Sequence, residues 1–367
     1  MQTATLEIAK YLKSNNWDVS IVSNRYPRNL SSKDEVEDIV INRFTFLHSP
    51  VTYLKSRRLD LFFAWFIFKP FTLGNLLFHF KKYKPDFVHI HFLDNQVLEV
   101  YLLKKIFSFK LIISFHGNDI EKIKSLNKKS VQYYLIQKVI NEAYLITGCS
   151  NYIKTQLSKA FIKLNTKKLF TLYNGVRNGF NSQKFENKKN GTILLAARNV
   201  PSKGPDMLFE LAYKYDRKKF IIAGAGYNRK IIIPNVEILG PLGIDDLTKE
   251  YLSSSITIIP SRNEAFGIVI AEALCCGCPI VATHVGGIPE VIKIAQTNLS
   301  VKEKEIFGKW VTLVEPTVES LSNGISHIMN NKNSIEEYLK IIPKIRTQFL
   351  WETRLDDFYN SNIMGAN

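Results

Sequence analysis

Residues 256–290 read ITIIPSRNEAFGIVIAEALCCGCPIVATHVGGIPE, and this stretch decides the fold. The apolar run 256–259 predicts a buried strand, and a second apolar run at 279–282 predicts the strand that follows it. The residues between them predict a helix that begins at about Phe266 and ends at Gly277. A strand, a helix and another strand in this order form the repeating unit of a parallel sheet.

The beginning of this predicted helix has the properties of an anion-binding site. Its first backbone N–H groups have no partner within the helix, and the helix dipole adds partial positive charge there. Gly267 removes the side chain at the point where a ligand approaches the backbone. Glu264 precedes the helix, and Glu272 lies about a turn and a half inside it. Carboxylates repel a phosphate, but they accept hydrogen bonds from hydroxyl groups on either side of one. Alternatively, Glu264 is an exposed loop residue and Glu272 is a partly buried, ion-paired helix residue.

Taken whole, the stretch closely resembles the signature of the retaining, nucleotide-sugar-dependent glycosyltransferases of family 4, whose E-x7-E motif falls on Glu264 and Glu272. The resemblance implies an α/β fold of the GT-B type, in which two Rossmann-like, doubly wound parallel-sheet domains face each other across a cleft. It also implies that Glu272 binds the ribose hydroxyls of the donor and that Glu264 binds the donor sugar. Phe266, Gly267 and Ile268 are implied to bind the donor as well.

Two cations follow the strand predicted at 192–197. Arg198 and Lys203 stand ahead of a glycine at the spacing that the family shows. Arginine can bind two phosphate oxygens in a fork and lysine adds a point charge, so the pair suits a diphosphate. Alternatively, both are solvated loop cations. Gly224, in the turn after the next predicted strand, is a further donor-binding candidate.

A second group of polar residues follows the strand predicted at 110–115. The tetrapeptide His-Gly-Asn-Asp at 116–119 stands at the C-terminal end of this strand, where open parallel sheets bind ligands. The resemblance implies that His116 faces the transferred sugar, and Asp119 is a further candidate. A single histidine after a strand can also be structural, and this is our interpretation of His89 and His91.

The net charge of +16 is unevenly distributed along the chain. The whole excess lies in residues 1–190, because residues 191–367 hold equal numbers of basic and acidic side chains. Nucleic acid and an acidic membrane surface are the partners with a strong negative field. No zinc-finger, RRM-like or helix-turn-helix pattern accompanies the charge, so the membrane surface is favoured and nucleic acid is not expected. Alternatively, the charge serves solubility alone.

The expected location is the cytoplasm, with peripheral attachment to the inner face of the cytoplasmic membrane. No signal-peptide pattern opens the chain. The four cysteines do not form two ligand pairs at zinc-site spacing, and we interpret them as packed, reduced thiols.

Residues 55–69, KSRRLDLFFAWFIFK, combine aromatic side chains with flanking cations. No apolar run reaches the length of about 18 residues that spans a bilayer, because the longest, 61–68, is expected to stop at Lys69 and Pro70. One interpretation is an interfacial segment on anionic lipid, with Trp65 at the level of the headgroups. The other is a core helix, which we favour because 61–68 has no polar face.

The sequence predicts two domains, at 1–185 and 191–348, with a polar linker at 187–191 between them. The resemblance implies that a final helix, at 349–367, packs back on the first domain. The polar, lysine-rich residues 293–309 are expected to form a surface insertion.

The first domain departs from the family at its beginning. Residues 3–14 predict an amphipathic helix and residues 17–23 a strand. A doubly wound domain places a strand and a glycine-bearing loop before its first helix, and no such strand precedes residue 3. Its absence is expected to expose the edges of the neighbouring strands. We interpret the chain either as having its true start upstream or as a truncated copy that is inactive.

The predicted function is transfer of a hexose from a UDP- or GDP-sugar to a hydroxyl acceptor with retention of anomeric configuration. The predicted catalytic residues are His116, Arg198, Lys203 and Glu264. No metal or other cofactor is expected, because no Asp-x-Asp motif is evident. The expected acceptor is a lipid-linked or other glycan in the synthesis of a bacterial surface polysaccharide or glycolipid. The alternatives are a non-catalytic nucleotide-sugar-binding remnant and a sugar-nucleotide epimerase of the same fold.

Overall fold

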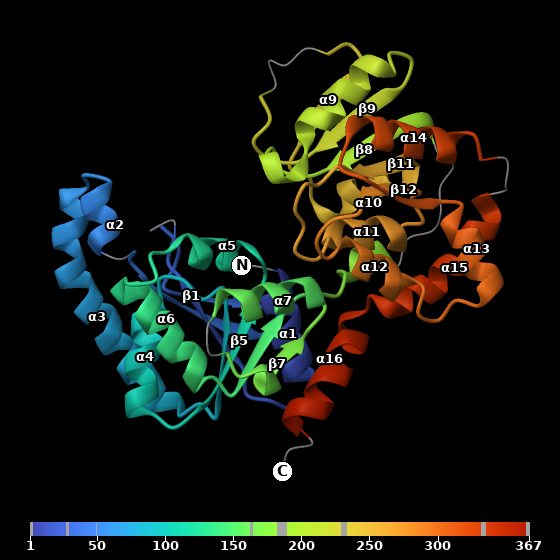
Figure 1. The fold of residues 1–367 in the computed structure, drawn as a ribbon. Coiled ribbons are helices and arrows are strands. Elements are labelled where there is room, and N and C mark those ends of the chain that lie inside the picture. Colours follow the sequence, from blue (N-terminus) through green and yellow to red (C-terminus); the bar gives the residue numbers. More distant parts are fainter. Residues whose placement is uncertain are drawn as a thin grey trace. The chain divides into compact units, whose positions relative to one another are not determined.

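The chain forms two compact units, residues 1–172 and 173–367, each built from a parallel sheet with helices around it (Figure 1). The computed structural model describes residues 3–26, 29–48, 50–161, 164–181, 189–228, 233–331 and 335–364. The α/β class predicted from the sequence is confirmed in both units.

The larger sheet of the N-terminal unit is parallel, and its strands are connected through helices. Its strands, in spatial order, are β4 (Phe87–His91), β5 (Lys110–Phe115), β6 (Leu145–Gly148) and β7 (Leu169–Thr171). The helices that follow these strands are α4 (Val97–Ile106), α5 (Asn118–Ser125), α6 (Val131–Glu142) and α7 (Asn151–Ala160). Ser150 caps α7 by accepting a hydrogen bond from the Ile153 N–H (3.1 Å).

A second, three-stranded sheet belongs to the same unit. Its order is β1 (Ser20–Asn24), β3 (Ile39–Phe44) and β2 (Lys33–Val36). Helix α1 (Thr3–Ser14) covers it, and Ala9 packs in one buried cluster with Ile21, Ile39 and Ile41. The predicted helix at 3–14 is therefore confirmed, while the predicted strand begins at residue 20. Strands β1 and β4 each lie at the end of their own sheet.

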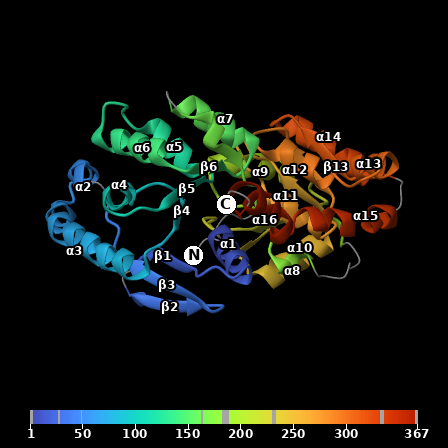
Figure 2. The ribbon, with the colours of Figure 1, turned by 90° about the horizontal axis from the view of Figure 1, so that it is seen from below.

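The apolar segment 61–68 is not a core helix, so the interpretation we favoured is wrong. It belongs to α3 (Leu59–Tyr83), which follows α2 (Pro50–Lys55) on the outside of the N-terminal unit (Figures 1 and 2). The helix continues through Pro70, an exposed residue in its interior. Among the described residues, α3 alone is long and apolar enough to cross a membrane, and 17% of its most apolar window is buried.

The C-terminal unit holds one six-stranded, wholly parallel sheet. Its order is β10 (Val236–Gly240), β9 (Lys219–Ala223), β8 (Lys189–Ala196), β11 (Ser254–Ile259), β12 (Ile280–Thr283) and β13 (Val311–Val314). The chain builds outward from β8 to β10 and then returns to build from β11 to β13. The strand order therefore reverses between β8 and β11, which pair directly through Ile193 opposite Ile256. Open α/β sheets bind ligands at such a reversal, beyond the C-terminal ends of the strands.

Nine α-helices of the described part of the chain belong to this unit. They are α8 (Asn178–Asn181), α9 (Pro205–Lys214), α10 (Ile244–Ser253), α11 (Ile268–Cys275), α12 (Ile288–Ala295), α13 (Val301–Gly308), α14 (Val318–Met329), α15 (Ile335–Gln348) and α16 (Trp351–Tyr359). The predicted strand, helix and strand of 256–290 are thus β11, α11 and β12. Helix α11 is almost wholly buried, and Gly277 follows it with a φ of 64°, as expected of a terminating glycine.

Three details of the sequence interpretation can be compared with this unit. The four cysteines are free and buried, as predicted. Of the predicted linker, residues 187–188 lie outside the described residues and 189–191 already belong to β8. The segment 293–309 ends α12 and then forms α13, whose capping box joins Ser300 and Glu303 and whose Phe307 is buried. The segment thus consists largely of helix, and most side chains of α13 are exposed.

Candidate functional site

The N-terminus of α11 begins at a glycine and, within the described residues, has no side-chain cap. Gly267 adopts a φ of 98°, which favours glycine. Phe266 is buried, and its ring centroid lies 6.0 Å from that of Tyr173. A ligand at this end of the helix can therefore meet the main chain at the positive end of the helix dipole and the partly exposed Ile268 side chain.

Lys203 and Glu264 are brought together by the sheet. Lys203 ends a short 3₁₀ turn (Pro201–Lys203) after β8, and Glu264 lies in the loop between β11 and α11. The Lys203 Nζ atom lies 2.5 Å from Glu264 Oε2, and both side chains are largely shielded from solvent. The sequence placed both residues at the site, but it did not predict that they form an ion pair.

A second ion pair fixes the same two loops to each other. Both terminal nitrogens of Arg262 contact the carboxylate of Asp206, and Nη1 also donates to the Pro201 carbonyl oxygen (3.0 Å). The Arg262 N–H donates to the Ser202 carbonyl oxygen (2.8 Å). These bonds hold the loop that carries Lys203 against the loop that carries Glu264.

Two consecutive glycines allow a third segment to approach the Glu264 loop. Gly286 has a φ of 58°, and a Cβ atom on it would overlap the carbonyl oxygen of Glu264. A Cβ atom on Gly287 would overlap the carbonyl oxygen of Ala265. The Gly287 N–H donates to the Glu264 carbonyl oxygen (2.9 Å). The Gly-Gly pair after β12 therefore supports the position of Glu264, a role that the sequence analysis did not assign.

The remaining candidates on this side of the sheet differ in their surroundings. Arg198 follows β8, is exposed, and has no side-chain partner among the residues that the structure describes. It is therefore available to an anion beside Lys203. Gly224 packs directly on the main chain of residue 197, because a Cβ atom there would overlap the Ala197 carbonyl oxygen. This contact is a structural reason for glycine at position 224.

Glu272 lies inside α11 and is only 7% exposed. Its Oε2 accepts a hydrogen bond from the Tyr251 hydroxyl of α10 (3.3 Å). Burial raises the pKa of Glu272 to about 7, and the positive charge of Arg177 and the Tyr251 hydrogen bond act in the opposite direction. Arg177 and Tyr251 belong to distant parts of the sequence, and no local pattern marked either of them.

In the N-terminal unit, His116 lies at the C-terminal end of β5, as predicted. The carboxylate of Asp119 accepts hydrogen bonds from the backbone N–H groups of His116 (3.1 Å), Gly117 (2.8 Å) and Ile120 (3.0 Å). Asp119 is buried and its oxygens are directed to the loop itself. Its observed role is therefore to hold the backbone at the beginning of α5, where Gly117 has a φ of 113°.

The His116 ring is held between two neighbours from the end of β4. Its Nε2 lies 3.1 Å from His91 Nδ1, and its ring stacks on Phe92 with centroids 4.3 Å apart. Phe92 has a φ of 59°, a strained conformation for an aromatic residue. Burial lowers the pKa of His116 to about 4 and holds the pKa of His91 well below its usual range. His91, which we had interpreted as a packing residue, therefore contacts the candidate site residue directly.

His89 extends this polar cluster into the sheet. Its Nε2 lies 2.6 Å from the Ser114 hydroxyl, which lies 2.6 Å from the Thr147 hydroxyl. Burial lowers the pKa of His89 to about 3, and the nearby His116 contributes to the shift. The cluster is thus neutral at physiological pH and joins β4, β5 and β6 beneath the loop of His116.

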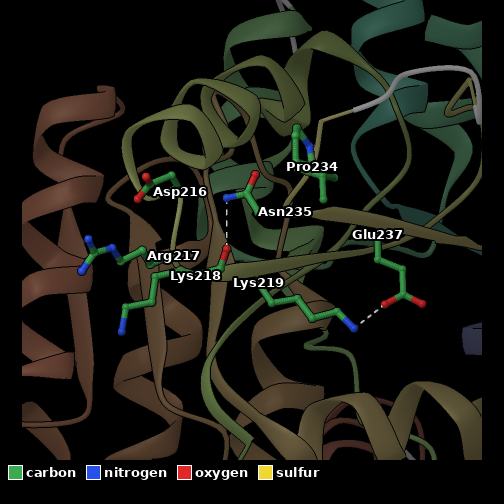
Figure 3. A pocket seen from close by; sticks show the side chains of 8 residues that line it. Asp216, Arg217, Lys218, Lys219, Pro234, Asn235 and Glu237 are labelled. Atoms are coloured by element: carbon green, nitrogen blue, oxygen red, sulfur yellow. Dashed lines mark hydrogen bonds and ion pairs between the residues drawn. The ribbon is translucent and has the colours of Figure 1, made fainter.

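A hollow elsewhere in the C-terminal unit can be distinguished from the candidate site. It is lined by residues 216–219, which lead into β9, and 234–237, which lead into β10 (Figure 3). Lys219 and Glu237 form an ion pair across it (2.6 Å), and Asn235 donates to main-chain carbonyl oxygens. It lies at the N-terminal ends of parallel strands, whereas the loops of Lys203 and Glu264 lie at C-terminal ends.

No group of three or more His, Cys, Asp or Glu side chains in the described ranges is placed to hold a metal ion. Metal independence itself stays a prediction.

Comparison with known proteins covers both units. A model of group 1 glycosyl transferases matches residues 177–348, and a model of glycosyltransferase family 4 matches residues 1–178. Together the two models span residues 1–348. The chain belongs to the group 1 glycosyltransferases of family 4. The family resemblance inferred from residues 256–290 is thereby confirmed. An uncharacterized glycosyltransferase of Methanocaldococcus jannaschii is 30% identical over 216 residues, which are 56% of this chain and 58% of that protein. The chain therefore spans less than two thirds of this curated relative.

Solved structures support the fold of the family. Sucrose-phosphate synthase from Thermosynechococcus elongatus matches with a TM-score of 0.72 at 15% identity, over 99% of this chain and 93% of that one. The HepE protein of Anabaena, solved with UDP and glucose, matches with a TM-score of 0.61 at 16% identity, over 90% of this chain and 87% of that one. At these identities the likeness shows the fold, and the GT-B class predicted from the sequence is confirmed.

Proposed function

We propose that this protein transfers a sugar from a nucleotide diphosphate sugar to a hydroxyl acceptor, with retention of configuration at the anomeric carbon. The observation that carries the proposal is the arrangement around the strand reversal of the C-terminal unit. Exposed Arg198, ion-paired Lys203 and the uncapped N-terminus of α11 are all attached to the C-terminal ends of two paired strands. Such a set of positive groups suits a diphosphate, and family membership agrees with that use.

The chemical task is to stabilise the charge of the leaving diphosphate. Arg198, Lys203 and the first N–H groups of α11 supply fixed positive charge, which is often the largest contribution to catalysis. A diphosphate that binds Lys203 competes with Glu264 for the ammonium group. Glu264 is then able to accept hydrogen bonds from hydroxyls of the donor sugar. We assign Glu272 to the ribose hydroxyls, as the family resemblance implies.

The proposal also covers His116, the metal requirement and the acceptor. His116 faces the transferred sugar, an assignment that rests on the resemblance. Transfer proceeds without a divalent cation, so a chelator leaves the rate unchanged. The acceptor is a lipid-linked or other glycan of a bacterial surface polysaccharide or glycolipid, presented at the cytoplasmic face of the membrane, and the net positive charge of residues 1–190 supports this choice.

The test begins with donor binding. Melting of the purified chain is followed with a panel of UDP- and GDP-sugars, and a donor that raises the melting temperature is then incubated with glycolipid and glycan acceptors. Mass spectrometry is expected to show an acceptor heavier by one sugar, and NMR of the new linkage to show the anomeric configuration of the donor. Donor binding without any transfer supports the non-catalytic alternative, and an epimerised donor sugar supports the epimerase. A melting temperature unmoved by every donor contradicts the proposal.

A further inference from the structure

Helix α3 presents an apolar face to solvent along most of its length. The six side chains that form this face are each more than half exposed, and we call them the aromatic ridge: Leu59, Phe63, Phe66, Ile67, Phe71 and Phe78. Their spacing follows the helical repeat of 3.6 residues per turn, so they lie on one side of the helix. From first to last the aromatic ridge is about 28 Å long, at a rise of 1.5 Å per residue.

The opposite side of α3 anchors the helix to its unit through polar contacts as well as apolar ones. Lys69 is buried and forms an ion pair with the buried Glu99 of α4 (2.5 Å). The Thr72 hydroxyl donates to the Thr45 carbonyl oxygen (2.9 Å), and Phe80 packs against Phe109 with ring centroids 5.6 Å apart. The usual arrangement of a surface helix is therefore inverted, with a lysine turned inward and aromatic rings turned outward. Packing within the unit does not account for the aromatic ridge.

We propose that the aromatic ridge inserts into the headgroup region of an anionic lipid bilayer, with α3 lying in the plane of the membrane surface. Cations stand at both ends of the ridge. Arg57 and Arg58 precede the helix, Lys81 and Lys82 end it, Lys84 follows, and all five are exposed. A helix with apolar side chains along one face and cations at both ends matches a surface that offers acyl chains below and negative headgroups above.

The same charges disfavour a second copy of this chain as the occupant of the ridge. Two copies packed ridge to ridge place cations against cations at both ends, whichever way the helices run. The only acidic residue of α3 is Asp60, and it already pairs with Arg58 (2.9 Å). A membrane-crossing arrangement is disfavoured by the Lys69–Glu99 pair, because α3 would have to leave α4 and expose both charges to lipid.

This inference does not depend on the proposed sugar transfer, since vesicle binding is measured without a donor or an acceptor. The experiment compares flotation of the whole chain with vesicles of phosphatidylcholine alone and of phosphatidylcholine mixed equally with phosphatidylglycerol. The ridge variant carries Phe63→Ser, Ile67→Ser and Phe71→Ser. The matched control carries Val131→Ser, Tyr134→Ser and Val301→Ser, three exposed apolar side chains away from α3. Circular dichroism and melting confirm that both variants fold.

The wild type and the control variant are expected to float with the phosphatidylglycerol vesicles. The ridge variant is expected to bind them at least about tenfold more weakly. A tenfold change in affinity corresponds to about 1.4 kcal/mol, and even partial insertion of three apolar side chains contributes more than that to the binding free energy. A variant with Lys81→Gln, Lys82→Gln and Lys84→Gln is expected to lose the preference for phosphatidylglycerol over phosphatidylcholine.

Three results would overturn the proposal. The first is equal vesicle binding by the ridge variant and the control variant. The second is a wild type that stays unbound and is dimeric by light scattering while the ridge variant is monomeric, which assigns the ridge to self-association. The third is binding that resists extraction at alkaline pH, which assigns α3 to a membrane-crossing state.

Discussion

Lys203 and Glu264 form an ion pair of 2.5 Å between residues 61 positions apart in the chain. The pair joins the two loops at the strand reversal of the C-terminal unit, and each group neutralises the other while no ligand is bound. An incoming diphosphate competes with Glu264 for the ammonium group. The pair is thus a compact means of keeping a carboxylate beside a phosphate site without repelling the phosphate.

Removal of Lys203 is expected to damage both donor binding and transfer. Lys203→Ala is predicted to lower kcat/KM for sugar transfer by about 100-fold or more, since fixed charge at a developing anion is lost. It also leaves Glu264 unpaired, so the second change Glu264→Gln in that background is expected to restore part of the UDP affinity. Lys249→Ala, which removes an exposed lysine paired with Asp246 (3.2 Å), is the control and is expected to have normal kinetics. Near-normal kinetics of Lys203→Ala would refute the assignment.

Nucleotide binding is expected to release protons through Glu272. Its pKa of about 7 leaves the carboxyl group partly protonated at neutral pH, and hydrogen bonds from ribose hydroxyls favour the charged form. Calorimetry uses a UDP-sugar, because the terminal phosphate of UDP itself titrates at about pH 6. At pH 7, in buffers of different ionisation enthalpy, binding is predicted to show net proton release. Glu272→Gln is expected to abolish the release. Glu237→Gln, at an exposed ion pair on β10, is the control and is expected to retain it. Equal release by all three proteins would remove Glu272 from the ribose site.

The free energies of unfolding of the two units are expected to change in opposite directions as the pH falls. The pKa values of His116 (about 4) and His89 (about 3) are below 6.5, so the unfolded N-terminal unit binds more protons than the folded one in that range. Its free energy of unfolding is therefore predicted to fall as the pH drops below 6.5, by about 1.4 kcal/mol per pH unit for each histidine. Glu272 has a raised pKa, so its contribution is present below pH 4.5 and is lost as the pH rises to about 7.

Scanning calorimetry between pH 5 and pH 7 checks these slopes. His89→Asn is expected to reduce the fall in the free energy of unfolding of the N-terminal unit as the pH drops. Glu272→Gln is expected to reduce the fall in the free energy of unfolding of the C-terminal unit as the pH rises, by about 3 kcal/mol in all. His327→Gln, at an exposed position on α14, is the control and is expected to change neither slope. A single transition with one common pH dependence in every variant would contradict the prediction.

Gly286 is expected to be required for the position of Glu264. Gly286→Ala adds a Cβ atom that overlaps the Glu264 carbonyl oxygen, in a left-handed conformation that costs about 1–2 kcal/mol for alanine. The variant is predicted to melt at a lower temperature and to bind the donor more weakly. Gly243→Ala is the control, because no atom lies within 4 Å of its added Cβ. Equal melting and donor affinity of the two variants would exclude this role.

The sequence predicted the elements of the C-terminal unit well where local patterns were strong. The two apolar runs around Gly267 became β11 and β12, and parallel pairing then placed Lys203 near Glu264. The partners of Glu272 were beyond prediction, because Arg177 and Tyr251 come from other helices and loops, and only the packed fold selects them.

The N-terminal unit shows a different limit. The apolar run 61–68 predicted a helix correctly, but hydrophobicity alone does not tell whether protein or another apolar phase covers a helix. The buried Lys69 was the discriminating residue, and its partner Glu99 lies in the next helix. His91 was likewise interpreted as packing, because a contact across neighbouring strands leaves no signal in a single sequence.

The pairing of β8 with β11 also has a practical meaning for redesign. Strands that share backbone hydrogen bonds keep a spacing of about 4.8 Å, so the pairing of β8 with β11 sets the distance between the loops of Lys203 and Glu264. The loop that follows β12 carries neither charge, but its Gly286 and Gly287 hold the Glu264 loop in place. An engineer seeking another donor can instead exchange the loops that follow β10 and β13 and leave that distance as it is.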